Sequence, residues 1–162
     1  QVLAPYKGKL TFPVAFDYEY DSIAYAQKQG INPSNDLIDG IAHAFLDVMK
    51  KNGWFANLYT NCDFIRSGKF SAATTKSYDV WLADYYSGGP DLPCGIQQTQ
   101  SGGIVSGIIG AVDMDMAFKD YPTIIRTGGY NGFPKPQLSN FKCDTTTDIT
   151  LSPGQPYQFK VT

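Results

Sequence analysis

The feature that most constrains the fold is a strand–helix–strand pattern in residues 10–59. Residues 10–19 contain an apolar run rich in strand-forming side chains, which is typical of a buried strand. A helical pattern follows in residues 34–51, and residues 55–59 form a second strand pattern. Two strands joined by a helix in this order pair in parallel through a crossover connection. The chain is therefore predicted to belong to the α/β class.

The predicted helix has a start signal, a stop signal and an apolar stripe. Ser34 or Asn35 is expected to be the N-cap, and Gly53 suits the position after the last turn. Apolar residues recur at spacings of four, four and three, as in a helix that faces a core. The residues expected to face the core are Leu37, Ile41, Phe45 and Val48, with Ile38 and Met49 beside them.

Weaker patterns continue the alternation of strands and helices to residue 127. Residues 63–70 are expected to form a short helix, and the strands expected next are 79–85, 94–100 and 112–116. Gly102 and Gly103 are expected to break the second of these strands, and a helical turn at 121–127 is stopped by Gly128. Residues 10–118 thus hold about five strands by this pattern.

Composition divides the chain into three parts. Residues 1–133 are expected to form the main domain, and residues 134–140 read as a proline-containing linker. Residues 141–162 are rich in threonine and alternate at 148–151 and 157–161, which predicts a β-rich extension. About twenty residues cannot form a sandwich alone, so this extension either packs on the main domain or begins a second module.

Charge and hydropathy argue against two classes of partner. The formal net charge of −2 gives no electrostatic case for binding nucleic acid. No apolar run reaches about 18 residues, so no membrane span is predicted. The first four residues, QVLA, have neither the basic region nor the long apolar core of a secretory signal. A signal could have been removed or never have existed.

Histidine and cysteine usage limits the chemistry that is available. His43 is the single histidine and lies inside the helix pattern, which favours a structural role and excludes Ser-His-Asp and Cys-His mechanisms. The cysteines Cys62, Cys94 and Cys143 are odd in number and match no metal motif. Reduced thiols are favoured, although a pairing of two stays open. Carboxylates remain as the acid–base groups, and no metal or organic cofactor is expected.

Asp17 and Glu19 end the first predicted strand. Residues two apart on a strand point to the same face, so the two carboxylates are expected to project together from its C-terminal end. Open and closed α/β folds place their chemistry at that end. Two nearby carboxyls do not ionise equally easily, and a pair of this kind suits the cleavage of a glycosidic bond. The same short pattern also occurs at many solvated strand ends.

Four motifs together resemble glycoside hydrolase family 25, the lysozymes (N-acetylmuramidases) of bacteria and their phages. They are residues 12–19 (FPVAFDYE), 58–61 (LYTN), 80–85 (VWLADY), and Gln98 followed by Gly103, Gly107 and residues 112–115 (VDMD). The motifs occur in the order and spacing of that family. The resemblance covers residues 10–133.

The resemblance implies a fold, an activity and a site. The family fold is an eight-stranded β/α barrel with its catalytic centre at the carboxyl ends of the strands. It implies that Glu19 is the general acid and that Asp17 and Asp113 are supporting carboxylates. The residues implied to line the glycan groove are Tyr59, Trp81, Tyr85 and Gln98. The implied reaction cleaves the β-1,4 bond between N-acetylmuramic acid and N-acetylglucosamine in peptidoglycan, without a cofactor. The implied setting is a secreted or cell-wall-acting enzyme of bacterial or phage origin.

The sequence departs from the family pattern in two places. Where the family usually has Trp-Gln-Tyr, this chain has Gln97-Gln98-Thr99, which removes two aromatic rings from the groove. Only nine residues precede the strand pattern that begins at residue 10, so the first strands of a β/α barrel and their aspartate are absent. The expected fold is therefore an incomplete, TIM-like barrel with open edges and a short C-terminal β extension. A dimer or an N-terminal companion fragment is expected to cover those edges.

Two alternatives to an active muramidase stay open. A non-catalytic or truncated fragment would bind wall glycan without cleaving it, and the absent first-strand aspartate favours this alternative. A structural β/α domain would explain the aromatic residues but not four ordered motifs. Asp115 is interpreted as a supporting or solvent-exposed residue rather than a catalytic one.

Overall fold

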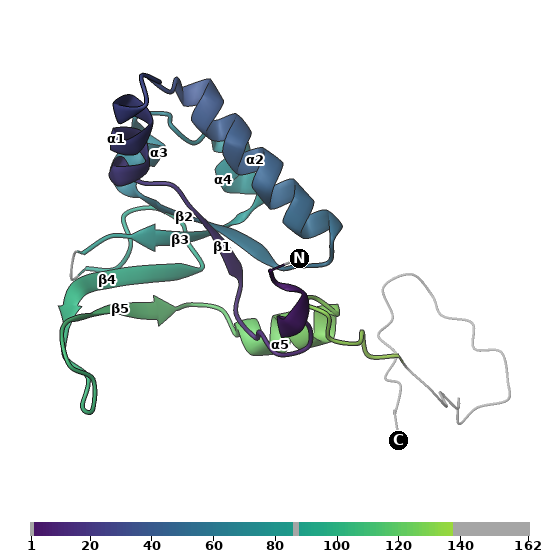
Figure 1. Cartoon of the computed structure of the whole chain (residues 1–162). Helices are drawn as coiled ribbons and strands as arrows, with labels where there is room; N and C mark the ends of the chain where they lie inside the picture. Colours follow the sequence, from purple (N-terminus) through teal and green to yellow (C-terminus); the bar gives the residue numbers. More distant parts are fainter. Residues whose placement is uncertain (1, 86–87, 138–162) are drawn as a thin grey trace, which may run out of the picture.

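A computed structural model describes residues 2–85 and 88–137, which form a mixed α/β structure around one curled, five-stranded sheet (Figure 1). The strands are β1 (Val14–Asp17), β2 (Ala56–Asn61), β3 (Asp79–Ala83), β4 (Ile96–Gly103) and β5 (Val112–Ala117). The helices are η1 (Ala4–Tyr6), α1 (Tyr20–Lys28), α2 (Asn35–Lys51), α3 (Cys62–Arg66), α4 (Ala72–Ser77) and α5 (Tyr121–Gly128). The predicted α/β class is confirmed.

The strands follow one another in chain order across the sheet. β1 to β4 are parallel, β5 is antiparallel to β4, and the first pair is joined through α2, as predicted. Asp17, Tyr59 and Trp81 are register partners on β1, β2 and β3, so their side chains leave the same face. In the described part of the chain, β1 and β5 each have one neighbouring strand, which leaves an open edge on either side of the sheet.

The main core lies between the sheet and the helices that cover one side of it (Figure 1). Phe16 of β1 and Leu58 of β2 pack with Leu46 of α2 and with Phe64 and Phe70 from the segment around α3. Burying a side chain of this size contributes about 1.5–3 kcal/mol. This packing fixes the directions of β1 and β2 and hence the place where they end.

The buried face of α2 differs from the prediction. Ser34 is the N-cap and its hydroxyl accepts from the Leu37 amide at 3.2 Å, as expected. However, the predicted core residues Leu37, Ile41 and Val48 are 48%, 41% and 57% exposed. Ile38 and Met49, which were expected beside that stripe, are buried together with Ala42 and Leu46, and the predicted Phe45 packs against the core. Both sets recur at helical spacing, and the docking of α2 on β1 and β2 selects between them.

The first strand is shorter than predicted. β1 ends at Asp17, and Glu19 is the N-cap of α1 rather than a strand residue. The Glu19 side chain accepts from the Ser22 amide, and the Ser22 hydroxyl accepts from the Glu19 amide at 3.3 Å, which is a capping box. α1 was not predicted, because it buries no residue and so has no apolar stripe. The argument that Asp17 and Glu19 share a strand face is therefore wrong.

Other element boundaries also differ from the expectations. α3 stops at Arg66, and α4 follows as a separate helix that was not predicted. β4 continues through Gly102 to Gly103 instead of breaking there. Any side chain at position 103 would overlap Met114 on β5. The glycine thus permits close pairing of the two strands.

Several predictions concern residues outside the described ranges. The β-rich extension at 141–162, residues 138–140 of the linker and Cys143 lie there. Cys62 and Cys94 are free thiols, in line with the favoured interpretation of the cysteines. Among the described residues, no helix is long and apolar enough to cross a membrane.

Asn131, three residues after the end of α5, connects the N-terminal segment to the residue before β2. Its side chain is fully buried, and its backbone has a positive φ of 54°. Its Oδ1 accepts from the Phe55 amide at 2.8 Å, and its Nδ2 donates to the carbonyls of Leu10 and Phe12 at 3.0 and 3.1 Å. These bonds hold the strand that carries Asp17 against the strand that carries Tyr59.

Candidate active site at the carboxyl ends of the strands

Polar and aromatic side chains gather where β1, β2 and β3 end. Asp17 is the last residue of β1, and Glu19 begins α1 immediately after it. A cavity of about 590 Å³ opens beside them. The residues that line this cavity are Glu19, Tyr20, Asn61, Cys62, Asp63, Ala83, Asp84 and Tyr85. Its position is the one that α/β folds use for ligands and catalysis.

Two opposing effects act on the Glu19 carboxyl. Its hydrogen bond with the Ser22 amide and the N-terminal end of α1 both favour the charged form. Partial burial disfavours that form, and so do the negative charges of Asp17, Asp21 and Asp113. Burial and repulsion prevail, and the pKa of Glu19 lies above its ordinary value. Glu19 therefore retains its proton to higher pH than a solvated glutamate, as a general acid must.

Asp17 and Asp113 reach this site from opposite sides of the sheet. Both residues are exposed, although removal from water by the surrounding protein still raises the pKa of Asp17. Asp113 lies on β5, which is not paired with β1, yet its charge contributes to the raised pKa of Glu19. The curl of the sheet thus brings β5 into electrostatic range of the end of β1.

These three carboxylates have no cationic partner among the described residues. The ion pairs of residues 2–85 and 88–137 join Arg66 to Asp91 at 2.8 Å and Lys119 to Asp79 at 2.5 Å. Neither pair includes Asp17, Glu19 or Asp113. A group of uncompensated carboxylates at the end of a sheet destabilises the fold locally, and such groups are concentrated at functional sites.

The predicted groove residues form one connected network. The Oε1 atom of Gln98 accepts from the Tyr59 hydroxyl at 2.8 Å and from the Tyr85 hydroxyl at 2.9 Å. The Tyr59 ring meets the Trp81 ring edge to face, with centroids 5.1 Å apart. The Trp81 indole donates to Asp115 at 2.7 Å, so Asp115 is a supporting residue here, as interpreted from the sequence. Burial is the main reason why the pKa of Tyr59 is raised, which keeps its hydroxyl protonated.

The sequence analysis missed several residues of this site. Asn61 ends β2 and caps α3 by accepting from the Phe64 amide at 2.9 Å. Tyr20 donates to Asp63 at 2.7 Å at the rim of the cavity. Asn61 is the last residue of β2 and Asp84 directly follows β3. A polar residue at a strand end is the signal that singled out Asp17, and it could have identified these two as well.

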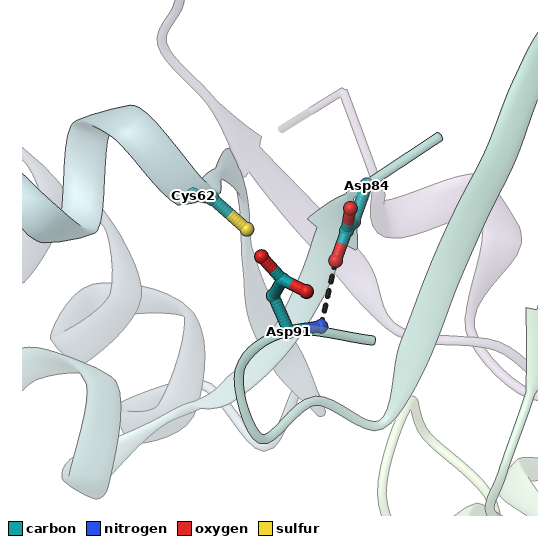
Figure 2. A group of neighbouring side chains, drawn as sticks. All are labelled: Cys62, Asp84 and Asp91. Carbon is teal, nitrogen blue, oxygen red and sulfur yellow. Dashed lines mark hydrogen bonds between the residues drawn. The ribbon is translucent and has the colours of Figure 1, made fainter. Parts of the chain in front are cut away.

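Cys62, Asp84 and Asp91 form the one group among the described residues with metal-ligand chemistry (Figure 2). Their ligand atoms lie within 4.8 Å of one another. The Asp84 carboxylate already accepts from the Asp91 amide at 2.7 Å, and the Asp91 carboxylate pairs with Arg66 at 2.8 Å. Burial raises the pKa of the Cys62 thiol, which disfavours the thiolate that a metal requires. Bonds within the loop explain the arrangement, and we assign no metal to it.

Comparison with known proteins found one partial likeness to report. No family model matches the chain, and no curated protein matches it. Among solved structures, the chain is similar to the CTP1L endolysin, whose crystal structure is described as revealing how its activity is regulated by a secondary translation product. The identity is 26% and the TM-score is 0.43, over 51% of this chain and 30% of the endolysin chain. The chain thus spans less than a third of the endolysin's length, and a likeness at this level establishes neither family nor function.

Proposed function

We propose that this chain is a peptidoglycan hydrolase of the muramidase type and that its barrel is of the family 25 lysozyme kind. The observation that carries the proposal is a group of three carboxylates, Asp17, Glu19 and Asp113, that has no cationic partner among the described residues. Partial burial, and then the charges of Asp17, Asp21 and Asp113, raise the pKa of Glu19. This group stands beside a network of aromatic and amide side chains at the carboxyl ends of parallel strands. The four ordered sequence motifs support the same assignment.

In this proposal Glu19 donates its proton to the oxygen of the glycosidic bond. The bond between that oxygen and the anomeric carbon breaks, and water supplies the hydroxyl that the anomeric carbon receives while a carboxylate of the site takes up the remaining proton of the water. Asp17 and Asp113 stabilise the positive charge that develops on the sugar, or orient its N-acetyl group. Each carboxylate therefore acts without a bound cofactor, and the raised pKa of Glu19 keeps the proton donor protonated to higher pH than a solvated glutamate.

Tyr59, Trp81 and Tyr85 are proposed to contact the glycan. An aromatic ring offers an apolar face to a sugar and, in tyrosine, a hydroxyl for hydrogen bonding. The network that Gln98 and Asp115 form around these rings limits their rotation. A groove built in this way binds a saccharide with little loss of side-chain entropy.

We also propose that the open edges of the sheet pair with another strand in the functional assembly, either in a dimer or with a companion chain. The support is that β1 and β5 each have a single neighbour among the described strands. Light scattering on the purified protein would test this proposal. A monodisperse monomer with full activity would contradict it.

The decisive test replaces Glu19 by glutamine and measures the release of reducing ends from purified peptidoglycan. Loss of the general acid should lower the rate by about 10²-fold or more. Asp21→Asn is a matched control, because Asp21 also influences the pKa of Glu19 but has no proposed contact with the substrate. Its rate should stay close to the parental rate.

Mass spectrometry of the reduced products identifies the bond. A muramidase leaves N-acetylmuramic acid at the reducing end, whereas a glucosaminidase leaves N-acetylglucosamine there. Parental activity in a folded Glu19→Gln protein would remove Glu19 from the mechanism. Intact glycan with tight binding would instead support the non-catalytic alternative.

A further inference from the structure

A buried amide fixes two tyrosine hydroxyls at the candidate site. Gln98 is only 3% exposed, and its single Oε1 atom accepts from both Tyr59 and Tyr85. A phenol has one proton to donate. Each of these protons is committed to Gln98 and is not available to a carboxylate.

Tyr59 lies next to Asp17 in the sheet, yet its hydroxyl bonds to the more distant Gln98. Tyr59 is the register partner of Asp17 on the neighbouring strand, so the two side chains leave the same face with their Cβ atoms about 5 Å apart. Gln98 lies on β4, two strands away from β2. The Tyr59 ring therefore leans away from Asp17 and across β3 to reach its acceptor.

Carboxylates from three elements influence the ionisation of Tyr59. Asp17 comes from β1, Glu19 from the start of α1, and Asp113 from β5, whereas the Tyr85 hydroxyl, which follows β3, is a neutral donor to Gln98. The charge of Asp21 on α1 also raises the pKa of Glu19. Asp115 on β5 accepts a hydrogen bond from Trp81, and removal from water and then the charge of Asp113 raise its pKa. A carboxylate is a stronger hydrogen-bond acceptor than a neutral amide. A Tyr59 hydroxyl without Gln98 would accordingly turn toward a carboxylate.

We propose that Gln98 is a positioning residue that draws the Tyr59 hydroxyl away from the carboxylates of Asp17 and Glu19. A hydrogen bond donated to a carboxylate favours its charged form and lowers its pKa. By holding the hydroxyl elsewhere, Gln98 leaves burial and mutual repulsion to keep the acid protonated. This role deepens the function proposed above, which needs a proton donor at this place.

The test is a titration that needs no substrate. The variant Gln98→Leu removes the acceptor at similar volume, and carbon-13 NMR of the side-chain carboxyls reports the pKa values of Asp17 and Glu19. We expect the pKa of at least one of them to fall by about one unit, the scale of a new hydrogen bond to a carboxylate. The double variant Gln98→Leu/Tyr59→Phe should restore the native values. Tyr85→Phe is the matched control, because it removes the other hydroxyl and should leave both values unchanged.

Unchanged values in a folded Gln98→Leu protein would overturn the proposal, and so would a fall that persists in the double variant. Tyr59→Phe alone provides a second test, which applies even where Gln98→Leu fails to fold. Because the native hydroxyl donates to Gln98 and not to a carboxyl, the pKa values of Asp17 and Glu19 should stay where they are. A rise would show that the hydroxyl already donates to one of them. Since no turnover is measured, these outcomes are independent of whether the chain cleaves peptidoglycan.

Discussion

Polar side chains are hydrogen-bonded or ion-paired at the amino end of the sheet, whereas three carboxylates at its carboxyl end lack a cationic partner among the described residues. At the amino end, Asn131 makes three side-chain hydrogen bonds, and the Asp79 carboxylate accepts from both Lys119 and Tyr121. At the carboxyl end, Asp17 and Asp113 both act electrostatically on Glu19, and none of the three is paired with a cation in the described chain.

This difference separates stability from function within one sheet. Buried polar groups that are fully paired rigidify a fold, whereas unpaired like charges weaken it. The amino end holds the strands in register, and that rigidity lets the carboxyl end keep its carboxylates close together. The ends should therefore respond oppositely to substitution, with stability lost at one and activity lost at the other.

The largest effect on stability is expected from Asn131→Ala. The change leaves the Phe55 amide and the carbonyls of Leu10 and Phe12 without their partners and places alanine at a positive φ. Each buried group without a partner costs about 1–3 kcal/mol, so the free energy of unfolding should fall by about 3–5 kcal/mol in urea titrations. Asn131→Gly tolerates the backbone angle, and its smaller loss would isolate the hydrogen bonds from the strain. A loss below about 1 kcal/mol would contradict the contrast between the ends.

Asp113→Asn should have the next largest effect, and on activity rather than stability. Removing this charge takes away one of the two carboxylates proposed to stabilise the positive charge on the sugar, a role that Asp21 does not share, and it also lowers the pKa of Glu19. The hydrolysis rate should fall about tenfold, and the basic limb of the pH profile should move to lower pH. The unfolding temperature should stay level or rise, because repulsion is relieved. A large loss of stability would place Asp113 with the structural groups instead.

Asn57 differs from the other buried polar residues at the amino end of the sheet, because its side chain has no hydrogen-bond partner among the described residues. It therefore tests whether pairing of polar groups is what stabilises this end. It is fully buried like Asn131, yet its Oδ1 and Nδ2 have no hydrogen-bond partner among the described residues. Replacing an unpaired buried amide by an apolar group of similar size is expected to stabilise a protein by about 1 kcal/mol. Thermal unfolding of Asn57→Leu should therefore show a gain, and Asn57→Ala, which leaves a cavity, should not. Destabilisation by leucine would reveal that the amide is bonded in solution.

The smallest expected effect is a change in the pH dependence of stability. The raised pKa values of Asp17 and Glu19 mean that the folded chain holds protons that the unfolded chain has released. Stability should thus decline as pH rises from the ordinary values of 3.8 and 4.5 through the raised ones. Asp17→Asn and Glu19→Gln should each flatten this decline in unfolding experiments at a series of pH values.

Asp39 provides the control of opposite sign. Burial opposes its ionisation, but hydrogen bonds from Thr74 and Ser71 outweigh burial and lower its pKa. Its contribution to stability is present above the ordinary value of 3.8 and is lost as pH falls through the lowered one. Asp39→Asn should reduce stability at neutral pH and not at strongly acidic pH. An equal loss at both would show that its effect does not depend on charge.

The sequence alone determined the features that depend on neighbours along the chain. It predicted the α/β class, the parallel pair around α2 and an N-cap at Ser34 or Asn35, of which Ser34 is the cap, because turns, caps and strand runs are local signals. It also selected four residues that the structure joins into one network, Tyr59, Trp81, Tyr85 and Gln98. These four came from the resemblance of their motifs to glycoside hydrolase family 25.

Only the tertiary structure decided the features that depend on packing between distant segments. Two stripes on α2 had helical spacing, and contact with Phe16 and Leu58 determined which one is buried. The end of β1 and the capping role of Glu19 depend on α1, which buries no residue and could not be predicted from an apolar stripe. Asn131 gave no signal in the sequence, since its partners Leu10 and Phe12 lie 121 and 119 residues away. Contacts over such separations leave no periodic trace in the chain, and folding alone brings them together.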